Sequence, residues 1–366
     1  MNIGVSPDFW KGRKVFLTGH TGFKGGWLSL WLQDMGADVT GYALAPSGQP
    51  NLFSLACIEK GMTSVIGDIC NAPALQKALQ VSQAEIVFHL AAQPLVRLSY
   101  EQPGETAATN IMGTVHLLEA VRTLKPVRAV VVVTSDKCYE NREIKWGYRE
   151  TDPMGGHDPY SASKGYAELL SAAWRNSFFR HNGVGLATAR AGNVIGGGDW
   201  SRDRLVPDIL NAIEKQIPLT VRNPHATRPW QHVLEPLAGY LMLAQNLYEK
   251  GDRFTSGWNF GPHMEDVCSV EWIVRRLSHH SGKPVDMQVV MPDRQQHEAG
   301  MLALDHTKAW YELGWKPIWS LDEALIKTAE WARACQEQDN MRTVCLRQIH
   351  AYHSGSGNRE TAEDVE

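Results

Sequence analysis

A tyrosine and a lysine four residues apart, Tyr160 and Lys164, are the side chains in this sequence whose spacing most directly suggests chemistry. On a helix, residues i and i+4 lie on one face, so the ammonium group would stand beside the phenol. A nearby cation stabilises a phenolate. A phenol whose pKa falls from about 10 to near neutrality, a change of about 4 kcal/mol, can take a proton from an alcohol. By itself, however, this short pattern is more often a chance pair on an exposed helix.

The segment before this pair favours the chemical interpretation. Residues 128–134 are nearly all valine, which predicts a buried strand, and Ser135, Asp136 and Lys137 follow it directly. Ligands bind at the carboxyl ends of the strands in open α/β sheets. We therefore expect these three side chains to meet Tyr160 and Lys164 at one site, although an ordinary polar turn has the same residue types.

A glycine-rich turn follows a short apolar strand at residues 14–18 and opens a helix. Its three glycines are spaced so that the turn can be tight, the backbone can approach a pyrophosphate, and the free N–H groups of the helix can point at it. The turn predicts a dinucleotide cofactor, whose positive nicotinamide would help Lys164 to stabilise the Tyr160 phenolate. The cofactor contacts expected here are Gly19, His20, Thr21, Gly22, Phe23, Lys24 and Gly25.

The adenosine end of the cofactor is less well determined. An acidic residue about 20 positions after the turn would bind the ribose of NAD, but residues 41–44 contain neither an acid nor an arginine. This feature leaves NAD and NADP open. Asp68 and Ile69, at the end of the third strand, are candidates for contact with the adenine, and Asp68 is equally well placed to cap a turn.

The elements that must position these residues alternate along the first half of the chain. Short apolar strands are expected at residues 14–18, 37–42, 63–67, 85–90, 128–134 and 185–191, with helices between them, notably at 105–124 and 160–179. This alternation predicts an α/β fold with a Rossmann-type, doubly wound parallel sheet. After Gly196 the alternation stops. Helices at 205–215, 234–249, 269–280 and 321–334 then predict a smaller C-terminal α/β lobe.

Composition argues against several other classes. The 366 residues include 36 Lys and Arg and 40 Asp and Glu, so a net charge of −4 gives no electrostatic reason to expect nucleic acid or a membrane surface as partner. The six cysteines form no CxxC pair and the histidines no HExxH pattern, so we expect no metal site. No apolar run reaches the roughly 18 residues of a membrane helix, and residues 1–14 lack the apolar run of a secretory signal. We expect a cytoplasmic protein.

Four segments together resemble the extended short-chain dehydrogenase/reductase family over about residues 12–335: the glycine turn, Leu90-Ala91-Ala92-Gln93, Ser135 with Tyr160 and Lys164, and Arg190-Ala191-Gly192-Asn193. Within that family, residues 18–25 and 134–139 resemble the CDP-glucose branch of the nucleotide-sugar 4,6-dehydratases. The resemblance implies NAD as cofactor, with Leu90, Ala91 and Ala92 beside it, and a nucleotide sugar, CDP-glucose, as substrate. It implies oxidation at C4, elimination of water across C5 and C6, and return of the hydride to C6.

The resemblance also implies roles for the side chains at the strand end. Tyr160 would be the base at the C4 hydroxyl, Lys164 would tune its pKa, and Ser135 would hydrogen-bond to the C4 oxygen. Asp136 would be the acid for the departing C6 hydroxyl. In the related dTDP-glucose dehydratases a glutamate stands where this chain has Lys137 and acts as the base at C5. The base is therefore left open here: it is a neutral Lys137, or another group while the Lys137 cation stabilises the enolate.

For the nucleotide sugar, the resemblance points mainly to the second half of the chain. Arg228 would clamp the diphosphate, because the guanidinium fork matches phosphate oxygens, and further substrate contacts are expected from Gln93, Asn193, Arg204 and Arg294. Residues 1–190 would form an NAD-binding Rossmann domain with return segments from the second half, 191–350 mainly a nucleotide-sugar-binding lobe, and 351–366 a flexible tail. The helices at 105–124 and 160–179 resemble those that pair subunits in this family, so we expect a homodimer or homotetramer.

Two other functions remain open on the sequence alone. A nucleotide-sugar epimerase or reductase would need only Ser135, Tyr160 and Lys164, with Asp136 as a bystander. A non-catalytic dinucleotide-binding module would need none of them, and the presence of all three argues against it. A dehydratase would supply deoxysugar synthesis, including that of lipopolysaccharide O-antigens.

Overall fold

The larger lobe is built on a seven-stranded sheet, in a computed structural model that describes residues 4–290 and 300–357. The strands are β1 (Lys14–Thr18), β2 (Asp38–Ala43), β3 (Thr63–Ile66), β4 (Ile86–His89), β5 (Ala129–Val133), β6 (Gly185–Ala191) and β10 (Gly257–Phe260). Their order is β10-β6-β5-β4-β1-β2-β3, and every neighbouring pair is parallel. This confirms the predicted doubly wound sheet. The order reverses between β1 and β4, where such sheets bind ligands.

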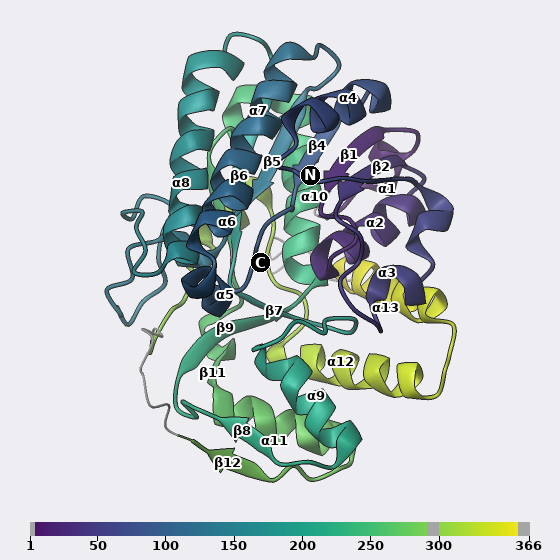
Figure 1. The fold of residues 1–366 in the computed structure, drawn as a ribbon, viewed down its shortest axis with the longest axis vertical. Helices are drawn as coiled ribbons and strands as arrows, with labels where there is room; N and C mark the ends of the chain where they lie inside the picture. The colour runs from purple at the N-terminus through teal and green to yellow at the C-terminus, as the bar shows by residue number, and fades with distance from the viewer. Residues whose placement is uncertain (1–3, 291–299, 358–366) are drawn as a thin grey trace, which may run out of the picture.

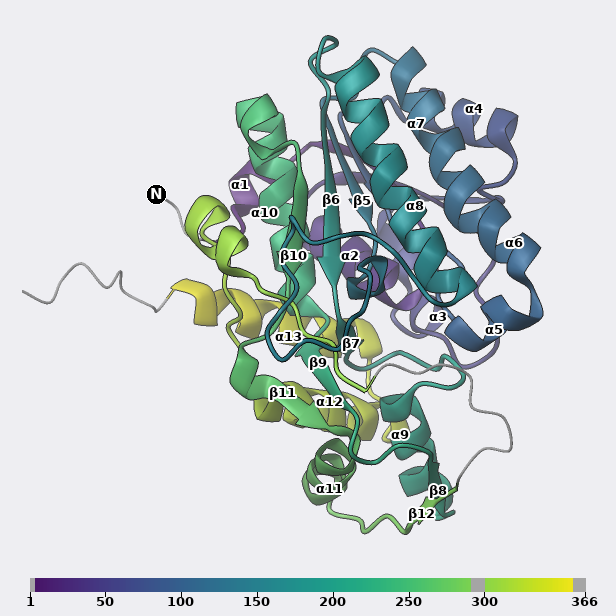
Figure 2. The same ribbon diagram turned by 90° about the vertical axis from the view of Figure 1, so that its left-hand side faces the viewer.

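Helices cover both faces of this sheet, which explains why its central strands are apolar throughout. In β5, Val131 and Val133 belong to one core cluster, whereas Val130 and Val132 belong to another, as the alternation of side chains along a strand requires. The helices α2 (Phe23–Asp34) and α10 (Leu234–Lys250) contribute to the first cluster, and α4 (Ala72–Ser82) and α7 (Gly113–Thr123) to the second. Figure 2 shows α10 and α7 on opposite sides of the sheet.

The two long helices predicted at 105–124 and 160–179 are present, and each contains a π-helical turn. The first consists of α6 (Pro103–Ala107), η2 (Ala108–Met112) and α7. The second consists of α8 (Pro159–Trp174) and η4 (Arg175–Phe179). The remaining short helices of the first half are α1 (Pro7–Trp10), α3 (Leu52–Leu55), η1 (Ile58–Gly61), α5 (Val96–Glu101) and η3 (Asp136–Cys138).

The smaller lobe lies beyond the carboxyl edge of the sheet (Figure 1). It contains a three-stranded sheet of β11 (Val267–Ser269), β9 (Thr227–His232) and β7 (Asn193–Ile195), and a pair formed by β12 (Met287–Val289) and β8 (Leu219–Val221). The predicted helices are found as α9 (Leu205–Lys215), α11 (Val270–Ser281) and α12 (Leu321–Gln336), and they enclose a third core cluster. The short helices η5 (Gly251–Phe254), η6 (Met264–Asp266) and η7 (Ala309–Leu313) complete the second half.

The C-terminal segment differs from the flexible tail predicted for residues 351–366. The helix α13 (Met341–Gly357) runs past the predicted boundary, and residues 358–366 lie outside the described part of the chain. Tyr352 is buried, and its hydroxyl donates to Oε2 of Glu235 at 2.7 Å. This contact anchors residues that the Ser- and Gly-rich sequence alone would not hold in a helix.

Candidate active site

The sheet and the smaller lobe enclose a cavity of about 1500 Å³. This volume exceeds the roughly 300–1000 Å³ of an ordinary small-molecule pocket and suits two large ligands together. Residues from five predicted groups line it: the glycine turn, the segment after β4, the end of β5, the start of α8, and the smaller lobe. They include Gly19, Phe23, Lys24, Gly25, Leu90, Ala92, Ser135, Asp136, Lys137, Tyr160, Lys164, Asn193, Arg204 and Arg228.

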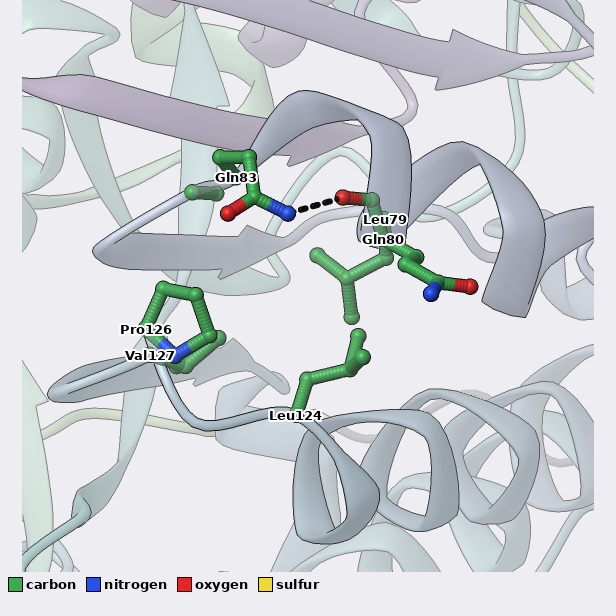
Figure 3. Close-up of a pocket in the computed structure, with 7 residues that line it drawn as sticks. Leu79, Gln80, Gln83, Leu124, Pro126 and Val127 are labelled. Carbon is green, nitrogen blue, oxygen red and sulfur yellow. Dashed lines mark hydrogen bonds between the residues drawn. The ribbon is translucent and has the colours of Figure 1, made fainter.

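A second hollow, between the end of α4 and the loop that leads into β5, is much smaller (Figure 3). Its volume is about 10 Å³, enough for one water molecule at most. Gln83 closes one side by donating from Nε2 to the backbone oxygen of Gln80 at 2.7 Å. Because its lining contains no titratable side chain, this hollow is not a candidate for catalysis.

The strand end and the helix that carry the candidate catalytic residues are fixed by local hydrogen bonds. β5 ends at Val133, and Ser135 begins the short helix η3, where its Oγ accepts from the backbone N–H of Lys137 at 3.2 Å. The helix α8 begins with Asp158 as its cap, because Oδ1 of Asp158 accepts from the N–H of Ser161 at 2.8 Å. Tyr160 therefore lies in the first turn of α8, facing the end of β5.

Asp136 is buried in the cavity wall. Its Oδ1 accepts a hydrogen bond from Oγ of Ser135 at 2.8 Å, and within residues 4–290 and 300–357 no group hydrogen-bonds to its Oδ2. Burial raises the pKa of this carboxyl, and the charges of Lys137, Arg228 and Lys24 and the bond from Ser135 only partly oppose it. Asp136 therefore keeps its proton to a higher pH than an ordinary aspartate does, which suits a general acid.

The pKa of Tyr160 depends on burial as well as on the charges near it. Burial raises the pKa of Tyr160 to about 12, while the hydrogen bond with Ser135 and the charge of Arg204 lower it only partly. The Lys164 ammonium stands 6.0 Å from the centre of the phenol ring and donates to the backbone oxygen of Val133 at 3.4 Å. Burial also lowers the pKa of Lys164 to about 8. Both partners are buried, which disfavours the charged form of each, so the expected lowering of the Tyr160 pKa depends on the nicotinamide charge as well as on Lys164.

The glycine turn has the shape required to hold a pyrophosphate. Gly19 adopts a φ of +80°, and a Cβ there would lie 2.8 Å from the backbone nitrogen of Ala91. A Cβ on Gly25 would lie 2.0 Å from the backbone oxygen of Gly19. Gly22 precedes α2 without a capping side chain, so the first N–H groups of the helix remain available to an anion. The turn therefore fits a dinucleotide, with Lys24, Leu90 and Ala92 beside it.

Five other predicted cofactor residues do not line the cavity with their side chains, and one of them, Ala91, packs against the second core cluster. The His20 ring is buried and bonds through Nε2 to Oγ of Ser64 at 2.7 Å, and burial lowers its pKa to about 4. Thr21 donates to the backbone oxygen of Leu44 at 2.9 Å. Asp68 accepts from the N–H of Cys70 at 2.8 Å, which is the turn-capping alternative. Ile69 is 5% exposed and belongs to the second core cluster. These residues shape the walls behind the turn.

The predicted substrate residues fall into three groups. Asn193, Arg204 and Arg228 line the cavity, and Asp199 holds Arg204 through a 2.9 Å ion pair. Gln93 does not line the cavity, because its amide donates to Thr106 at 2.9 Å and accepts from the N–H of Leu95. Arg294 lies outside the described residues.

Sequence reasoning missed several charged residues at the mouth of the cavity. Arg97 pairs with Asp203 at 3.1 Å, and Arg222 approaches the same carboxylate at 3.5 Å. All three line the cavity. No sequence motif marks these residues. Arg97 and Asp203, for example, are 106 residues apart in the sequence.

In the part of the chain that the structure describes, no group of three or more His, Cys, Asp or Glu side chains could hold a metal ion. Among the same residues, none of the helices is both long and apolar enough to cross a membrane.

Comparison with known proteins identifies the family. The family model described as GDP-mannose 4,6 dehydratase matches residues 16–328. A CDP-glucose 4,6-dehydratase from Salmonella typhimurium is 52% identical over 357 residues, which cover 96% of this chain and 99% of that protein. A dTDP-glucose 4,6-dehydratase from Xanthomonas campestris is 28% identical, over 86% of this chain and 92% of the relative.

Solved structures agree on the fold. A dTDP-glucose 4,6-dehydratase from Bacillus anthracis, solved in complex with NAD, superposes with a TM-score of 0.74 at 21% identity and covers 90% of this chain and 100% of that one. A UDP-glucose 4-epimerase from Stenotrophomonas maltophila, solved with bound NAD, gives a TM-score of 0.77 at 22% identity, over 89% of this chain and 99% of that one. The chain belongs to the GDP-mannose 4,6-dehydratase family, within the extended short-chain dehydrogenases/reductases, as its motifs indicated.

Proposed function

We propose that this protein is an NAD-dependent hydro-lyase that converts CDP-glucose to CDP-4-dehydro-6-deoxyglucose and water. The observation that carries the proposal is the buried Asp136 beside Ser135 and Tyr160, in a chain 52% identical to a CDP-glucose 4,6-dehydratase along almost its whole length. An epimerase or reductase needs no acid at this position. A carboxyl whose pKa is raised by burial suits the departure of a hydroxyl group, because it holds its proton to a higher pH than an exposed aspartate does.

Each side chain at the end of β5 has a proton to hold or move. Tyr160 takes the proton of the C4 hydroxyl as that carbon becomes a ketone, and Ser135 donates a hydrogen bond to the same oxygen. The ketone acidifies the C5 hydrogen. Asp136 then gives its proton to the C6 hydroxyl, which leaves as water. NAD, when bound against the glycine turn, would supply the hydride acceptor and donor, so the reaction would need no added oxidant, and its positive ring would add to the charge of Arg204 in lowering the pKa of Tyr160.

Lys137 lies at the same strand end and lines the cavity, so it is placed to act at C5. We propose that it either takes the C5 proton or stabilises the enolate as a cation. On the smaller-lobe side of the cavity, Arg228, Asn193 and Arg204 bind the sugar diphosphate. Arg294, outside the described residues, is proposed as a further substrate contact on the family resemblance alone. Arg228 is buried and its charge reaches Asp136, so the diphosphate and the acid are held on adjoining walls.

We further propose that the protein is a homo-oligomer that works in the cytoplasm. The helices η2, α8 and η4 expose large apolar side chains in one region of the larger lobe: Met112, Tyr166, Leu169 and Phe178. Helices with such faces pair readily with a second copy. All six cysteines are unpaired, in keeping with a reducing compartment. The product class would supply deoxysugar and O-antigen precursor synthesis.

The experiment that tests the reaction is incubation of the purified protein and NAD with CDP-glucose, dTDP-glucose, UDP-glucose, GDP-glucose and GDP-mannose in parallel. The expected result is loss of one water from CDP-glucose by mass spectrometry, with a product that absorbs in alkali and no net change in NADH. An isomer of unchanged mass would indicate an epimerase, and consumption of added NADH a reductase. Turnover of another nucleotide sugar in preference to CDP-glucose would overturn the choice of substrate.

A further inference from the structure

A buried carboxylate with no part in the proposed reaction stands behind the candidate catalytic residues. Glu168 lies on α8 one turn beyond Lys164, and it is 5% exposed. Its Oε1 accepts from Oγ1 of Thr134 and from Nε of Arg190 at 2.9 Å. Its Oε2 accepts from Oγ1 of Thr188 at 2.6 Å and from Nη2 of Arg190 at 2.7 Å. Four hydrogen bonds thus fix both oxygens.

Arg190 extends this cluster to two further elements. The guanidinium is 4% exposed, and its Nη1 donates to the hydroxyl of Tyr139 at 2.6 Å. That hydroxyl donates in turn to Oδ1 of Asn259 on β10 at 2.7 Å. Gly257 makes room for the arginine, because a Cβ there would lie 2.2 Å from Nη2. The cluster therefore joins α8, β6 and β10 to the residues that directly follow β5 (Thr134) and η3 (Tyr139).

A buried ion pair is weak support for stability, because removal of two charges from water costs about as much as their attraction returns. Its better-attested use is to fix one arrangement of the elements that it joins. Here the ion pair and its hydrogen bonds fix the position of the carboxyl end of β5 relative to α8. Thr134 directly precedes Ser135, and Glu168 shares its helix with Tyr160 and Lys164. Lys164 makes a second tie to the same strand end through the backbone oxygen of Val133.

We propose that Glu168 is a positioning residue which, through the hydroxyl of Thr134, sets Ser135 and Asp136 against Tyr160. The inference rests on the proposed function for what these residues do, but the tie itself is a property of the fold. Supporting this role, burial lowers the pKa of Lys164, whereas Cys138 and Glu168 are the two groups that raise it. The same carboxylate thus helps to keep Lys164 charged.

The two threonines that donate to Glu168 provide a matched pair for the test. Both are buried, at 5% exposed for Thr134 and 0% for Thr188, and each bonds one oxygen of the same carboxylate. They differ in their place along the strands. Thr134 adjoins Ser135 outside the regular strand, whereas Thr188 lies in the middle of β6, where the backbone is already paired on both sides.

The variants are Thr134→Val and Thr188→Val, which remove a hydroxyl while keeping the shape, with Thr134→Ser as the conservative control. We expect the two valine variants to lose similar thermal stability. Thr134→Val should lower kcat for CDP-glucose about 10- to 100-fold with KM within about twofold, since small misplacements of reacting groups have effects of this size. Substrate deuterated at C4 should show a larger isotope effect in that variant. Thr188→Val and Thr134→Ser should retain kcat within about threefold.

A readout that needs no turnover separates this inference from the proposed reaction. The N–H of Lys137 donates to Oγ of Ser135, and the N–H of Cys138 donates to the backbone oxygen of Ser135. Amide hydrogen exchange in residues 134–139, measured by mass spectrometry, should accelerate in Thr134→Val and not in Thr188→Val. If the wild-type protein leaves CDP-glucose unchanged, the proposed function fails while the exchange difference still supports the tie. Equal losses of kcat, or equal exchange in the two valine variants, would overturn the positioning role.

Discussion

At the residue scale, burial decides which protons the candidate catalytic groups hold. Tyr160 and Asp136 lie at the same strand end, and burial raises the pKa of both, so the phenol and the carboxyl each favour their protonated form. For Asp136 this is the form that an acid requires. Tyr160 must instead lose its proton to act as a base. A positive charge brought against the phenol would lower its pKa and make this possible.

Replacement of Tyr160 by phenylalanine tests the base. Tyr160→Phe removes the proton acceptor at C4 without changing the shape of the ring, so kcat should fall at least about 100-fold, the scale of a lost acid–base group. The measurement is formation of the alkali-absorbing ketone from CDP-glucose, with NAD and substrate affinities by calorimetry as the control. Activity retained within a few-fold would remove Tyr160 from this role.

The role of Lys137 can be separated from that of Tyr160 by exchange with solvent. If Lys137 takes the C5 proton, Lys137→Met should abolish the incorporation of deuterium at C5 from heavy water while leaving oxidation at C4 possible. NMR of the recovered substrate and product reports this exchange directly. Exchange at the wild-type rate would show that another group is the base and that Lys137 acts through its charge.

Asp136 offers a prediction about stability and pH. Because burial raises its pKa in the folded protein, the folded state holds this proton more tightly than the unfolded state, whose aspartate has a pKa of about 3.9. Stability associated with Asp136 is therefore complete below that value and declines as the pH rises through the folded pKa. Asp136→Asn should lose dehydratase activity yet melt higher than wild type at neutral pH, with the difference vanishing near pH 4. A variant that melts lower at neutral pH would contradict the burial argument.

The limits of prediction at this scale are physical. The residue types and spacing of Ser135, Asp136, Tyr160 and Lys164 were enough to place these side chains at one cavity. The direction of the Tyr160 pKa was not predictable, because the degree of burial is a property of the folded chain. Gln93 has the residue type of a substrate contact, but its amide groups are taken up by its own loop and by Thr106.

At the element scale, the glycine turn is the feature whose geometry is most restrictive. A Cβ on Gly25 would lie 2.0 Å from the backbone oxygen of Gly19, so Gly25→Ala must displace the turn itself. Overpacking of this kind costs about 1–3 kcal/mol. We expect a lower melting temperature and NAD affinity reduced at least tenfold, measured by thermal denaturation and calorimetry. The control is Gly104→Ala in α6, where nothing lies within 4 Å of the added atom.

The strands and helices that sequence predicted well are those with strong periodicity or a run of β-branched residues, such as β5 and α7. Residues 351–366 were predicted to be a flexible tail, and serine and glycine near residue 355 are indeed poor helix formers. The helix α13 instead continues to Gly357, and the hydrogen bond from Tyr352 to Glu235 holds its later turns against α10. The short strand β10 (Gly257–Phe260) also depends on tertiary contacts, because its pairing with β6 makes it a strand. Such elements depend on partners distant in sequence, which local patterns do not contain.

At the scale of the whole molecule, the reaction requires that the two lobes meet around one cavity. The larger lobe supplies the cofactor turn and the acid–base residues, and the smaller lobe supplies Asn193, Arg204 and Arg228. Arg97 and Asp203 bridge the two sides of the mouth at 3.1 Å. Substrate recognition and chemistry are thus divided between lobes, while α10, β10 and α13 of the second half pack onto the larger one.

The apolar face of α8 gives the prediction for assembly. Tyr166 and Leu169, one turn apart, are 55% and 59% exposed, and burial of the exposed parts of both side chains against a second copy would contribute about 2–3 kcal/mol. The double variant Tyr166→Glu/Leu169→Glu should therefore shift the protein from dimer or tetramer to a smaller species in light scattering after size exclusion. Tyr311→Glu is the matched control, because Tyr311 is 76% exposed on η7, which packs against α10 and β10. Neither Tyr166 nor Leu169 lines the cavity, so a well-folded monomer of the double variant should still bind NAD. An unchanged mass in the double variant, or an equal shift in the control, would show that α8 is not the face that pairs the subunits.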